Sequence, residues 1–217
     1  EGIDIMLAID VSTSMLAEDL KPNRLEAAKD VAAEFINGRP NDNIGITLFA
    51  GETFTQCPLT VDHAVLLDMI HNIKCGLITD GTAVGMGIAN AVTRLKDSKA
   101  KSKVIILLTD GTNNKGDISP MTAAEIAKSF GIRVYTIGVG TNGMAPYPYP
   151  VGNTVQYVSM PVEIDEKTLT EIAGTTDGNY FRATSNSKLK EVYEEIDKLE
   201  KTKLNVKEYS KRDEEYH

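Results

Sequence analysis

The sequence is 217 residues long and carries 31 acidic side chains against 23 Lys and Arg, which gives a formal net charge of −8. Hydrophobic residues make up 41% and charged residues 25% of the chain, a balance that is typical of a globular domain and excludes a disordered one. The acidic excess argues against a nucleic-acid-binding protein, because such proteins need Lys- and Arg-rich surfaces that neutralise phosphates. No stretch approaches the roughly 18–20 apolar residues that cross a bilayer.

Four short apolar runs predict buried strands, because the strands of a parallel sheet are covered on both faces and read as almost continuous hydrophobic sequence. These runs are 3–9, 44–49, 104–108 and 134–139. Residues 53–57 follow the second run across a short turn that contains Gly51, which predicts an antiparallel strand at the edge of the sheet. A further short strand is predicted at 180–181.

Helical segments alternate with these strands, since apolar residues recur there at steps of three and four. The predicted helices are 25–35, 61–71, 83–95, 166–173, 189–199 and one between Pro120 and Gly131. Gly38 ends the first of them, and Ser119-Pro120 supplies an N-cap and a first-turn proline for the fourth in chain order. The alternation predicts an α/β fold with a doubly wound, mostly parallel sheet, one antiparallel edge strand and helices on both faces.

The domain organisation predicted from these elements is simple. Residues 1–204 form one domain, and residues 205–217 form a charged tail that frays or acts as a linker. Residues 144–158, in which prolines alternate with tyrosines, are expected to be an extended loop packed on its own domain, with a contact patch as the alternative. The chain begins at Glu1 and enters a strand at once, so we expect it to be a piece of a longer protein.

The cysteines and histidines do not suggest a metal centre of their own. Cys57 and Cys75 are too few for a disulfide scaffold or a zinc cluster, and we predict that both are thiols packed as small hydrophobic groups. The histidines lack metal-ligand spacing relative to these cysteines; they are His63, His71 and His217. Zinc chemistry and cysteine–histidine catalysis are therefore not predicted.

A carboxylate and two hydroxyls follow the first predicted strand, in the order Asp10, Ser12 and Ser14. An open parallel sheet binds its ligands at the carboxyl ends of the strands, which is where this segment lies. Side chains at alternate positions of one short loop aim three oxygens at a single point. Oxygen ligands select hard divalent cations, so the segment predicts a site for Mg²⁺, with Mn²⁺ or Ca²⁺ as substitutes.

A second acidic residue stands in the same position at another strand. The strand 104–108 runs into Asp110, and a glycine-containing loop between the two strands carries Thr82. Each feature alone also fits a helix cap or an ordinary strand end, but together they predict a convergent metal site. The predicted ligands are Asp10, Ser12, Ser14, Thr82 and Asp110. Two carboxylates leave a cation under-neutralised and open to an acidic group from outside.

Other active-site motifs are incomplete. Residues 138–143 match G-x-G-x-x-G after a strand, but a proline- and tyrosine-rich stretch follows instead of the helix that a dinucleotide site requires. Ser12 and Ser14 lack the G-x-S-x-G surroundings of a hydrolase nucleophile. We therefore predict that the chain is not an enzyme. A metal-dependent hydrolase of phosphate esters that uses the same cation is kept as the alternative, and a scaffold with a vestigial motif is the third.

The combination of Asp10-x-Ser12-x-Ser14, Thr82 within GTAVG and Asp110 within LLTDG resembles the metal-ion-dependent adhesion site of von Willebrand factor A domains. The resemblance covers nearly the whole chain. Residues 164–184 and 195–203 are similar to the bacterial aerotolerance (Bat) group in particular, of the BatA type. Thr13 is a departure, because the family usually has glycine there, but it removes no ligand.

The resemblance implies a Rossmann-like fold and a non-catalytic module. In such domains the five positions bind Mg²⁺, some of them through water, and an Asp or Glu carboxylate of a protein partner completes the coordination. The implied partners are other Bat-type membrane proteins. Bat proteins of this type are anchored by transmembrane helices that flank the domain, so we expect a soluble domain at the periplasmic face of the inner membrane.

Overall fold

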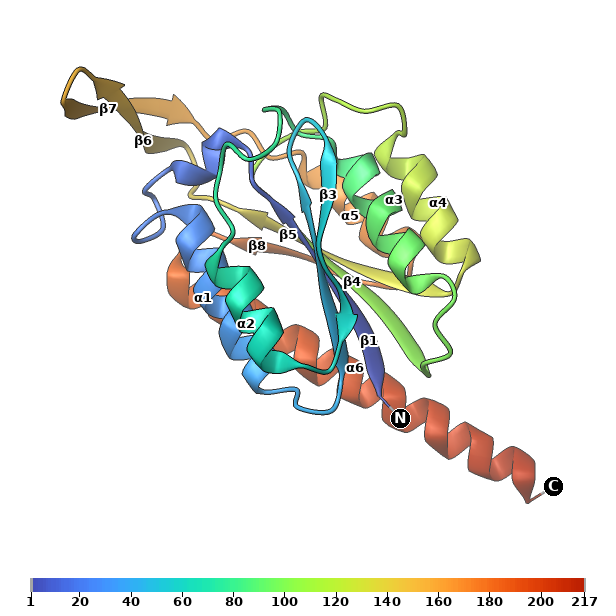
Figure 1. Cartoon of the computed structure of the whole chain (residues 1–217). Coiled ribbons are helices and arrows are strands. Elements are labelled where there is room, and N and C mark those ends of the chain that lie inside the picture. Colours follow the sequence, from blue (N-terminus) through green and yellow to red (C-terminus); the bar gives the residue numbers. More distant parts are fainter. Residues whose placement is uncertain (1, 217) are drawn as a thin grey trace.

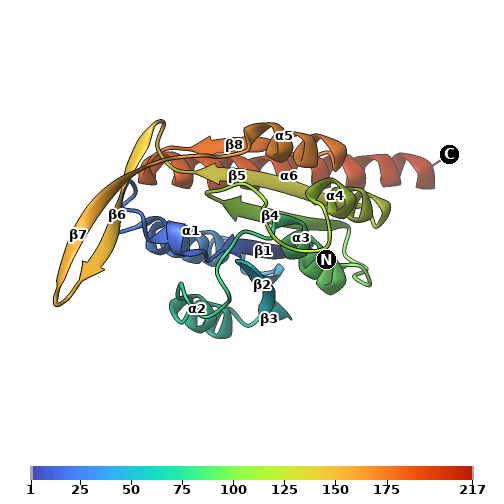
Figure 2. The ribbon, with the colours of Figure 1, turned by 90° about the horizontal axis from the view of Figure 1, so that it is seen from above.

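The computed structural model describes residues 2–216 and shows a sheet between two layers of helices (Figures 1 and 2). The strands of this sheet are β1 (Ile3–Asp10), β2 (Asn43–Phe49), β3 (Thr53–Thr60), β4 (Ser102–Thr109), β5 (Ile132–Val139) and β8 (Tyr180–Ala183). Their order in space is β3-β2-β1-β4-β5-β8. Every neighbouring pair is parallel except β2 and β3, so the predicted mostly parallel sheet with one antiparallel edge strand is confirmed.

The helices cover both faces of the sheet, as predicted. One layer consists of α3 (Val84–Leu95), α4 (Pro120–Ser129) and α5 (Glu166–Thr175), and the other of α1 (Arg24–Asn37), α2 (His63–His71) and α6 (Asn186–Glu215). Successive side chains of a strand point to opposite faces, and β1 shows this directly. Leu7 and Ile9 belong to the core under α1, whereas Met6 and Ala8 belong to the core under α3.

The strand order places the predicted site at the point where the sheet changes winding direction. From the central strand β1 the chain passes through α1 to β2 on one side, and later through α3 to β4 on the other. The connections therefore leave in opposite directions above the carboxyl ends of β1 and β4. Asp10 ends β1 and Asp110 directly follows β4. Ligands of open α/β sheets bind in this position, so the topology supports the site predicted from sequence.

Residues 144–158 are not an extended loop, so this prediction was wrong. They form most of a hairpin of β6 (Met144–Val151) and β7 (Thr154–Pro161), which projects from the body of the molecule in Figure 1. Gly152 takes a positive φ of 60° in the two-residue turn, a conformation that glycine adopts at little cost. Prolines usually argue against a strand, but an outer edge tolerates them because no ladder hydrogen bond is lost there.

The tail is helical in the structure. Helix α6 continues to Glu215, although the sequence predicted a frayed tail or linker from residue 205. The distal part is held by contacts with the segment before β4, where Lys207 Nζ donates to the carbonyl of Lys101 at 2.7 Å and Lys101 pairs with Glu208 at 3.1 Å. Among the helices of residues 2–216, α6 included, none combines the length and the apolar character that crossing a membrane requires.

Candidate metal centre

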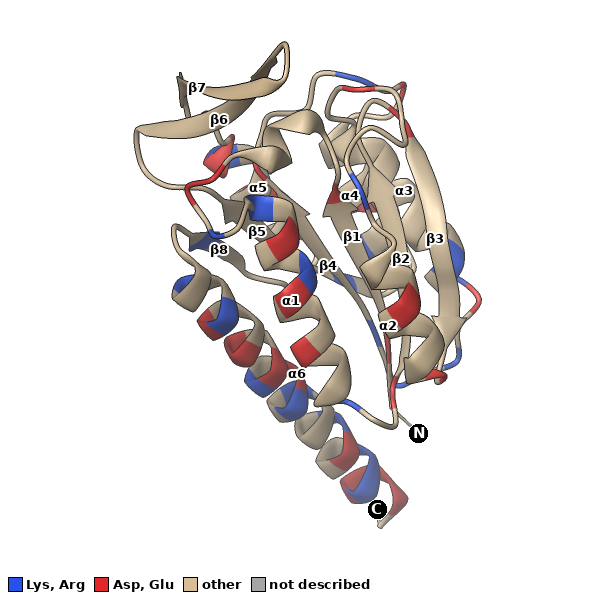
Figure 3. Cartoon of the chain, turned by 60° about the vertical axis from the view of Figure 1, so that its left-hand side comes forward, with Lys and Arg blue, Asp and Glu red and all other residues tan. Residues whose placement is uncertain are grey.

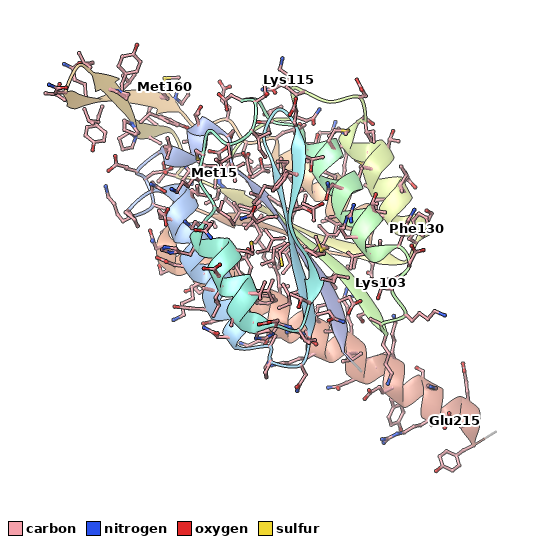
Figure 4. The ribbon with its side chains drawn as sticks, in the orientation of Figure 1. Met15, Lys103, Lys115, Phe130, Met160 and Glu215 are labelled. Carbon is pink, nitrogen blue, oxygen red and sulfur yellow. The ribbon has the colours of Figure 1, made fainter. Side chains whose placement is uncertain are left out.

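Asp10 and the two serines after it form one side of the candidate site. Asp10 is fully buried, and its Oδ1 accepts a hydrogen bond from the backbone N–H of Ser12 at 2.8 Å. The chain then turns through the short 3₁₀ helix η1 (Thr13–Leu16), which brings the hydroxyl oxygens of Ser12 and Ser14 to 2.9 Å from each other. Met15, labelled in Figure 4, points into the core and fixes this turn. The loop therefore gathers three side-chain oxygens, as its sequence predicted.

The end of β4 supplies the opposite side. Ser14 donates its hydroxyl proton to Asp110 Oδ1 at 2.8 Å, and the hydroxyl of Thr109 donates to Asp10 Oδ2 at 2.8 Å. Asp110 is 4% exposed and Ser12 is 4% exposed, so the cluster lies just beneath the surface. Four of the five predicted ligands are thus brought together from two strands; they are Asp10, Ser12, Ser14 and Asp110. Their role as metal ligands remains a prediction.

Thr82 lies at the rim of this cluster. Its backbone N–H donates to Asn114 Oδ1 at 2.9 Å, which fixes the loop before α3 against the loop after β4. A Cβ atom placed on Gly111 would lie 3.6 Å from Thr82 Oγ1, so the hydroxyl stands next to the residue that follows Asp110. Within residues 2–216, no hydrogen bond joins this hydroxyl to the other four predicted ligands. The structure therefore puts Thr82 beside the cluster and leaves its hydroxyl available.

Arg24 is part of the site, although sequence reasoning did not identify it. Its Nη1 donates to Asp110 Oδ2 at 2.9 Å, and its Nε and Nη2 each donate to Asp19 at 2.7 Å. The Arg24 side chain is completely buried. One signal was present in the sequence, since Arg24 immediately precedes the helix predicted from residue 25, and the dipole at a helix N-terminus disfavours a cation. A cation in that place indicates a nearby acidic partner.

The departure at position 13 also has a structural explanation. The backbone N–H of Thr13 donates to Asp80 Oδ1 at 3.1 Å, and its hydroxyl donates to Asp80 Oδ2 at 2.9 Å. Asp80 belongs to the loop that carries Thr82. Thr13 therefore ties the two loops together, a contact that glycine would make only through its backbone.

Burial makes the charge state of the site unusual. Burial, followed by the nearby charge of Asp110, raises the pKa of Asp10 to about 7. Burial also raises the pKa of Asp110, although Arg24 acts in the opposite direction. Asp19, by contrast, has its pKa held below the usual range by hydrogen bonds from Arg24 and Thr141, which outweigh its burial. Burial therefore opposes the ionisation of Asp10 and Asp110 at the same time. A cation bound between them would favour the state in which both carboxylates are ionised.

The donor set fits a hard divalent cation. The two carboxylates and the three hydroxyls offer only oxygen atoms, which suit Mg²⁺, Mn²⁺ and Ca²⁺ better than soft metals. Over residues 2–216, no cluster of three or more His, Cys, Asp or Glu side chains has the arrangement of a metal site. The candidate centre is of a different kind, since only Asp10 and Asp110 among its donors belong to those residue types.

Cys75 packs against the loop that carries Ser12 and Ser14. Its Sγ donates to the carbonyl of Ser12 at 3.4 Å, and both it and Cys57 are free thiols in the part of the chain that the structure describes. Burial, reinforced by the charges of Asp10 and Asp110, raises the pKa of Cys75 to about 12. Burial also raises the pKa of Cys57. Neither thiol therefore has appreciable thiolate character at neutral pH.

We expect the native protein to resist alkylation by iodoacetamide at pH 8, because the thiolate is the reactive form. Intact-mass spectrometry should find almost no adduct on the folded protein, and two adducts after unfolding in urea, which serves as the control. Rapid labelling of Cys75 in the folded protein would contradict this expectation.

Comparison with known proteins identifies the family. The model of the von Willebrand factor type A domain matches residues 4–195. The crystal structure of BatB from Bacteroides thetaiotaomicron is 35% identical, with 92% of this chain and 100% of that chain covered and a TM-score of 0.80. An aerotolerance-related membrane protein from Bacteroides fragilis is 31% identical, with coverage of 94% and 100% and a TM-score of 0.79.

Two further comparisons concern the metal site and the length of the relatives. Proximal thread matrix protein 1 from the mussel byssus, with a zinc-occupied MIDAS motif, is 25% identical, with 91% of this chain and 45% of that chain covered and a TM-score of 0.71. A Borreliella burgdorferi protein is 29% identical over 95% of this chain, which spans 61% of that relative. The chain thus covers about three fifths of its curated relatives. It belongs to the von Willebrand factor type A domain family and is similar to Bat-group aerotolerance-related proteins.

Proposed function

We propose that the chain is a non-catalytic interaction module that binds Mg²⁺ and uses it to dock an acidic side chain of a protein partner. The observation that carries this proposal is the cluster of Asp10, Ser12, Ser14 and Asp110 at the carboxyl ends of β1 and β4. The relatives named above are not enzymes by name, and one neighbour of this fold holds zinc in the corresponding motif.

The charge of the site explains why a partner would be acidic. When Mg²⁺ is bound, it supplies two positive charges at the mouth of a site that offers two carboxylates, one of which is already paired with Arg24. The serines and Thr82 add oxygens without charge. A divalent cation held in this way keeps an affinity for one more carboxylate, which is why an Asp or Glu side chain is the proposed ligand. Mn²⁺ and Ca²⁺ are the proposed substitutes.

The biological setting belongs to the same proposal. Because solved relatives include an aerotolerance-related membrane protein, we place this domain in a membrane-anchored bacterial protein of related function. Its partners would then be other Bat-type membrane proteins, and the domain would face the periplasm.

Capture from detergent-solubilised membranes tests the docking. Immobilised wild-type domain should retain a partner in Mg²⁺ and release it in EDTA, while the Asp10→Asn and Asp110→Asn variants should retain none. Asp117→Asn, which removes an exposed carboxylate from the loop that follows β4, is the matched control and should behave as wild type. Converting the carboxyl groups of the membrane proteins to amides should abolish capture. Equal capture in Mg²⁺ and in EDTA would contradict metal-dependent docking and favour a scaffold with a vestigial motif.

The same preparations distinguish the hydrolase alternative. Under the proposal, wild type and Asp10→Asn should show the same background rate on p-nitrophenyl phosphate in Mg²⁺. Turnover by the wild type that is lost in Asp10→Asn would instead assign the site to phosphoester hydrolysis.

A further inference from the structure

The hairpin of β6 and β7 carries no charge, although the chain as a whole has a formal net charge of −8. Residues 141–162 contain no Asp, Glu, Lys, Arg or His, and the hairpin is uniformly tan in Figure 3. It also presents large hydrophobic side chains to solvent, among them Tyr149 at 60%, Val155 at 56% and Tyr157 at 58% exposure. An uncharged and apolar projection is unusual on an acidic protein and indicates a contact surface.

The base of the hairpin is fixed to the body through β6. The backbone N–H of Glu18 donates to the carbonyl of Pro146 at 2.9 Å, and Arg24 Nη1 donates to the hydroxyl of Tyr147 at 3.1 Å. Ala145 is buried. Every residue of β7, by contrast, is exposed, and Figure 2 shows β7 as the outermost strand. The hairpin is therefore attached to the body of the domain through β6, and its second strand, β7, faces solvent.

The register shows which backbone groups of β7 point outward. In an antiparallel pair, residues that face each other alternate between those that exchange hydrogen bonds and those whose N–H and C=O point away. The carbonyl of Pro146 points away from β7, because it accepts from Glu18. Its partner across the hairpin is Ser159, and the next pairs of the same kind join Pro148 to Tyr157 and Pro150 to Val155. The N–H and C=O groups of Val155, Tyr157 and Ser159 therefore face outward.

These outward groups have no partner in residues 2–216, since β7 pairs only with β6 and no other hydrogen bond reaches their backbone. Natural sheets usually protect such an edge with charges, prolines, bulges or short strands. The edges of the main sheet follow this rule, because β3 contains Pro58 and register irregularities and β8 has 4 residues. The edge of β7 is eight residues long and lacks these protections apart from Pro161 at its end.

The other edge of the hairpin is blocked. The outward positions of β6 are held by Pro146, Pro148 and Pro150, which have no N–H to donate. A strand can therefore be added to β7 but not to β6. Addition of a second hairpin through its own β7 gives a four-stranded sheet whose two outer edges are both the proline edge of β6. Such an assembly stops at two copies.

We propose that β7 is a homodimerisation edge, through which two copies of this chain pair antiparallel about a twofold axis at Tyr157. In this register Tyr157 lies opposite its own copy, and Val155 lies opposite Ser159 of the second copy. Each facing pair exchanges two backbone hydrogen bonds, so the outward groups of one edge satisfy those of the other. The strands themselves carry no charge, and the Glu18 carboxylate beside the Tyr157 hydroxyl is the charge that lies close to the axis. Because the register of this edge pairs with itself, the occupant that it fits is a second copy of the same chain.

Sedimentation equilibrium over a series of concentrations tests the dimer. The wild type should show a monomer–dimer equilibrium, and Tyr157→Pro, which removes one central outward N–H, should weaken dimerisation by about tenfold or more. Tyr157→Val keeps the N–H and a strand-forming side chain, so it is the matched control and should dimerise. Asp10→Asn should dimerise as the wild type does, because the edge is independent of the metal site.

A cysteine substitution tests the register without removing a hydrogen bond. Facing residues that exchange hydrogen bonds have Cα atoms about 5.5 Å apart, which is within the range that a disulfide spans. Tyr157→Cys should therefore form a covalent dimer on mild oxidation, whereas Val155→Cys, whose counterpart lies several residues away, should remain monomeric on denaturing gels. Three results would overturn the proposal: a wild type that is monomeric at every concentration, assembly beyond two copies, or a dimer that Tyr157→Pro leaves intact.

Discussion

Replacing Arg24 by methionine should lower the free energy of unfolding by about 3–5 kcal/mol, which is the usual cost of removing one partner from a buried ion pair. Methionine has a similar length and keeps most of the apolar packing of the Arg24 stem. It leaves Asp110 and Asp19, whose side chains are 0% and 2% exposed, without the guanidinium that pairs with both. Urea denaturation of the metal-free protein, followed by circular dichroism, measures the change.

Arg24→Lys provides the control for this prediction. Lysine keeps the positive charge but cannot donate to Asp19 and Asp110 in the forked geometry of a guanidinium, so an intermediate loss is expected. Excess Mg²⁺ should restore more stability to Arg24→Met than it adds to the wild type, because the cation compensates the charge that Asp110 has lost. A loss below about 1 kcal/mol in Arg24→Met would show that Arg24 does not hold the site together.

Asp10→Asn should make the metal-free protein more stable at pH 8, even though it destroys the proposed metal site. The folded protein raises the pKa of Asp10 from 3.8 to about 7, so the folded state binds the proton more tightly than the unfolded state does. That contribution to stability is complete below about pH 4 and is lost as the pH rises through about 7. Asparagine is neutral at every pH, so the variant does not lose this stability. At pH 8 we expect its free energy of unfolding to exceed that of the wild type by an amount on the order of 2–4 kcal/mol.

Thermal unfolding in EDTA at a series of pH values measures this effect. The wild type should lose stability between about pH 4 and pH 7, and the Asp10→Asn variant should lose much less over the same interval. Asp117→Asn is the matched control, because it removes one exposed carboxylate and leaves the buried pair unchanged. A variant less stable than the wild type at pH 8 would show that the hydrogen bonds of the Asp10 carboxylate outweigh the cost of its buried charge.

The central part of the fold could be predicted from the sequence because its strands are buried on both faces. The runs that predicted β1, β2, β4 and β5 are apolar at nearly every position, and the structure extends each by at most a few residues. The edge strand β3 was predicted only over residues 53–57, and the next residue is Pro58. At an edge a proline loses no ladder hydrogen bond, so the strand continues to Thr60.

The hairpin and the end of α6 could not be predicted from the sequence. Their residues are mostly exposed, so they lack the apolar pattern by which buried strands and helices are recognised. Prolines at alternate positions of β6 mask that strand, and in β7 the alternation of polar and apolar residues holds only over the first four residues, 154–157. The last residues of α6 are mostly charged or polar and resemble a solvated tail. In the structure Lys207 and Glu208 contact Lys101, a residue about a hundred positions earlier, and local sequence does not reveal such a contact.

The candidate site also has a part that could be predicted from the sequence and a part that could not. Asp10, Ser12, Ser14 and Asp110 lie close to strand ends, so their convergence followed from the strand order. Arg24 reaches the site from the first turn of α1, and its acidic partners, Asp19 and Asp110, lie far apart in the chain. Such a long-range buried ion pair is fixed by tertiary packing and has no sequence spacing of its own. The position of a cation at a helix N-terminus was the one local sign of it.

Isothermal titration calorimetry of Mg²⁺ into the EDTA-stripped protein tests the central claim most directly. The wild type and the Asp117→Asn control should bind one Mg²⁺ per chain, with an observed heat that varies with the ionisation enthalpy of the buffer, because the metal displaces the proton that burial retains on Asp10 and that proton passes to the buffer. Asp10→Asn should give only the heat of dilution. Saturable binding of equal strength in the wild type and in Asp10→Asn would contradict the assignment of this cluster as the metal centre, and so would no binding in either.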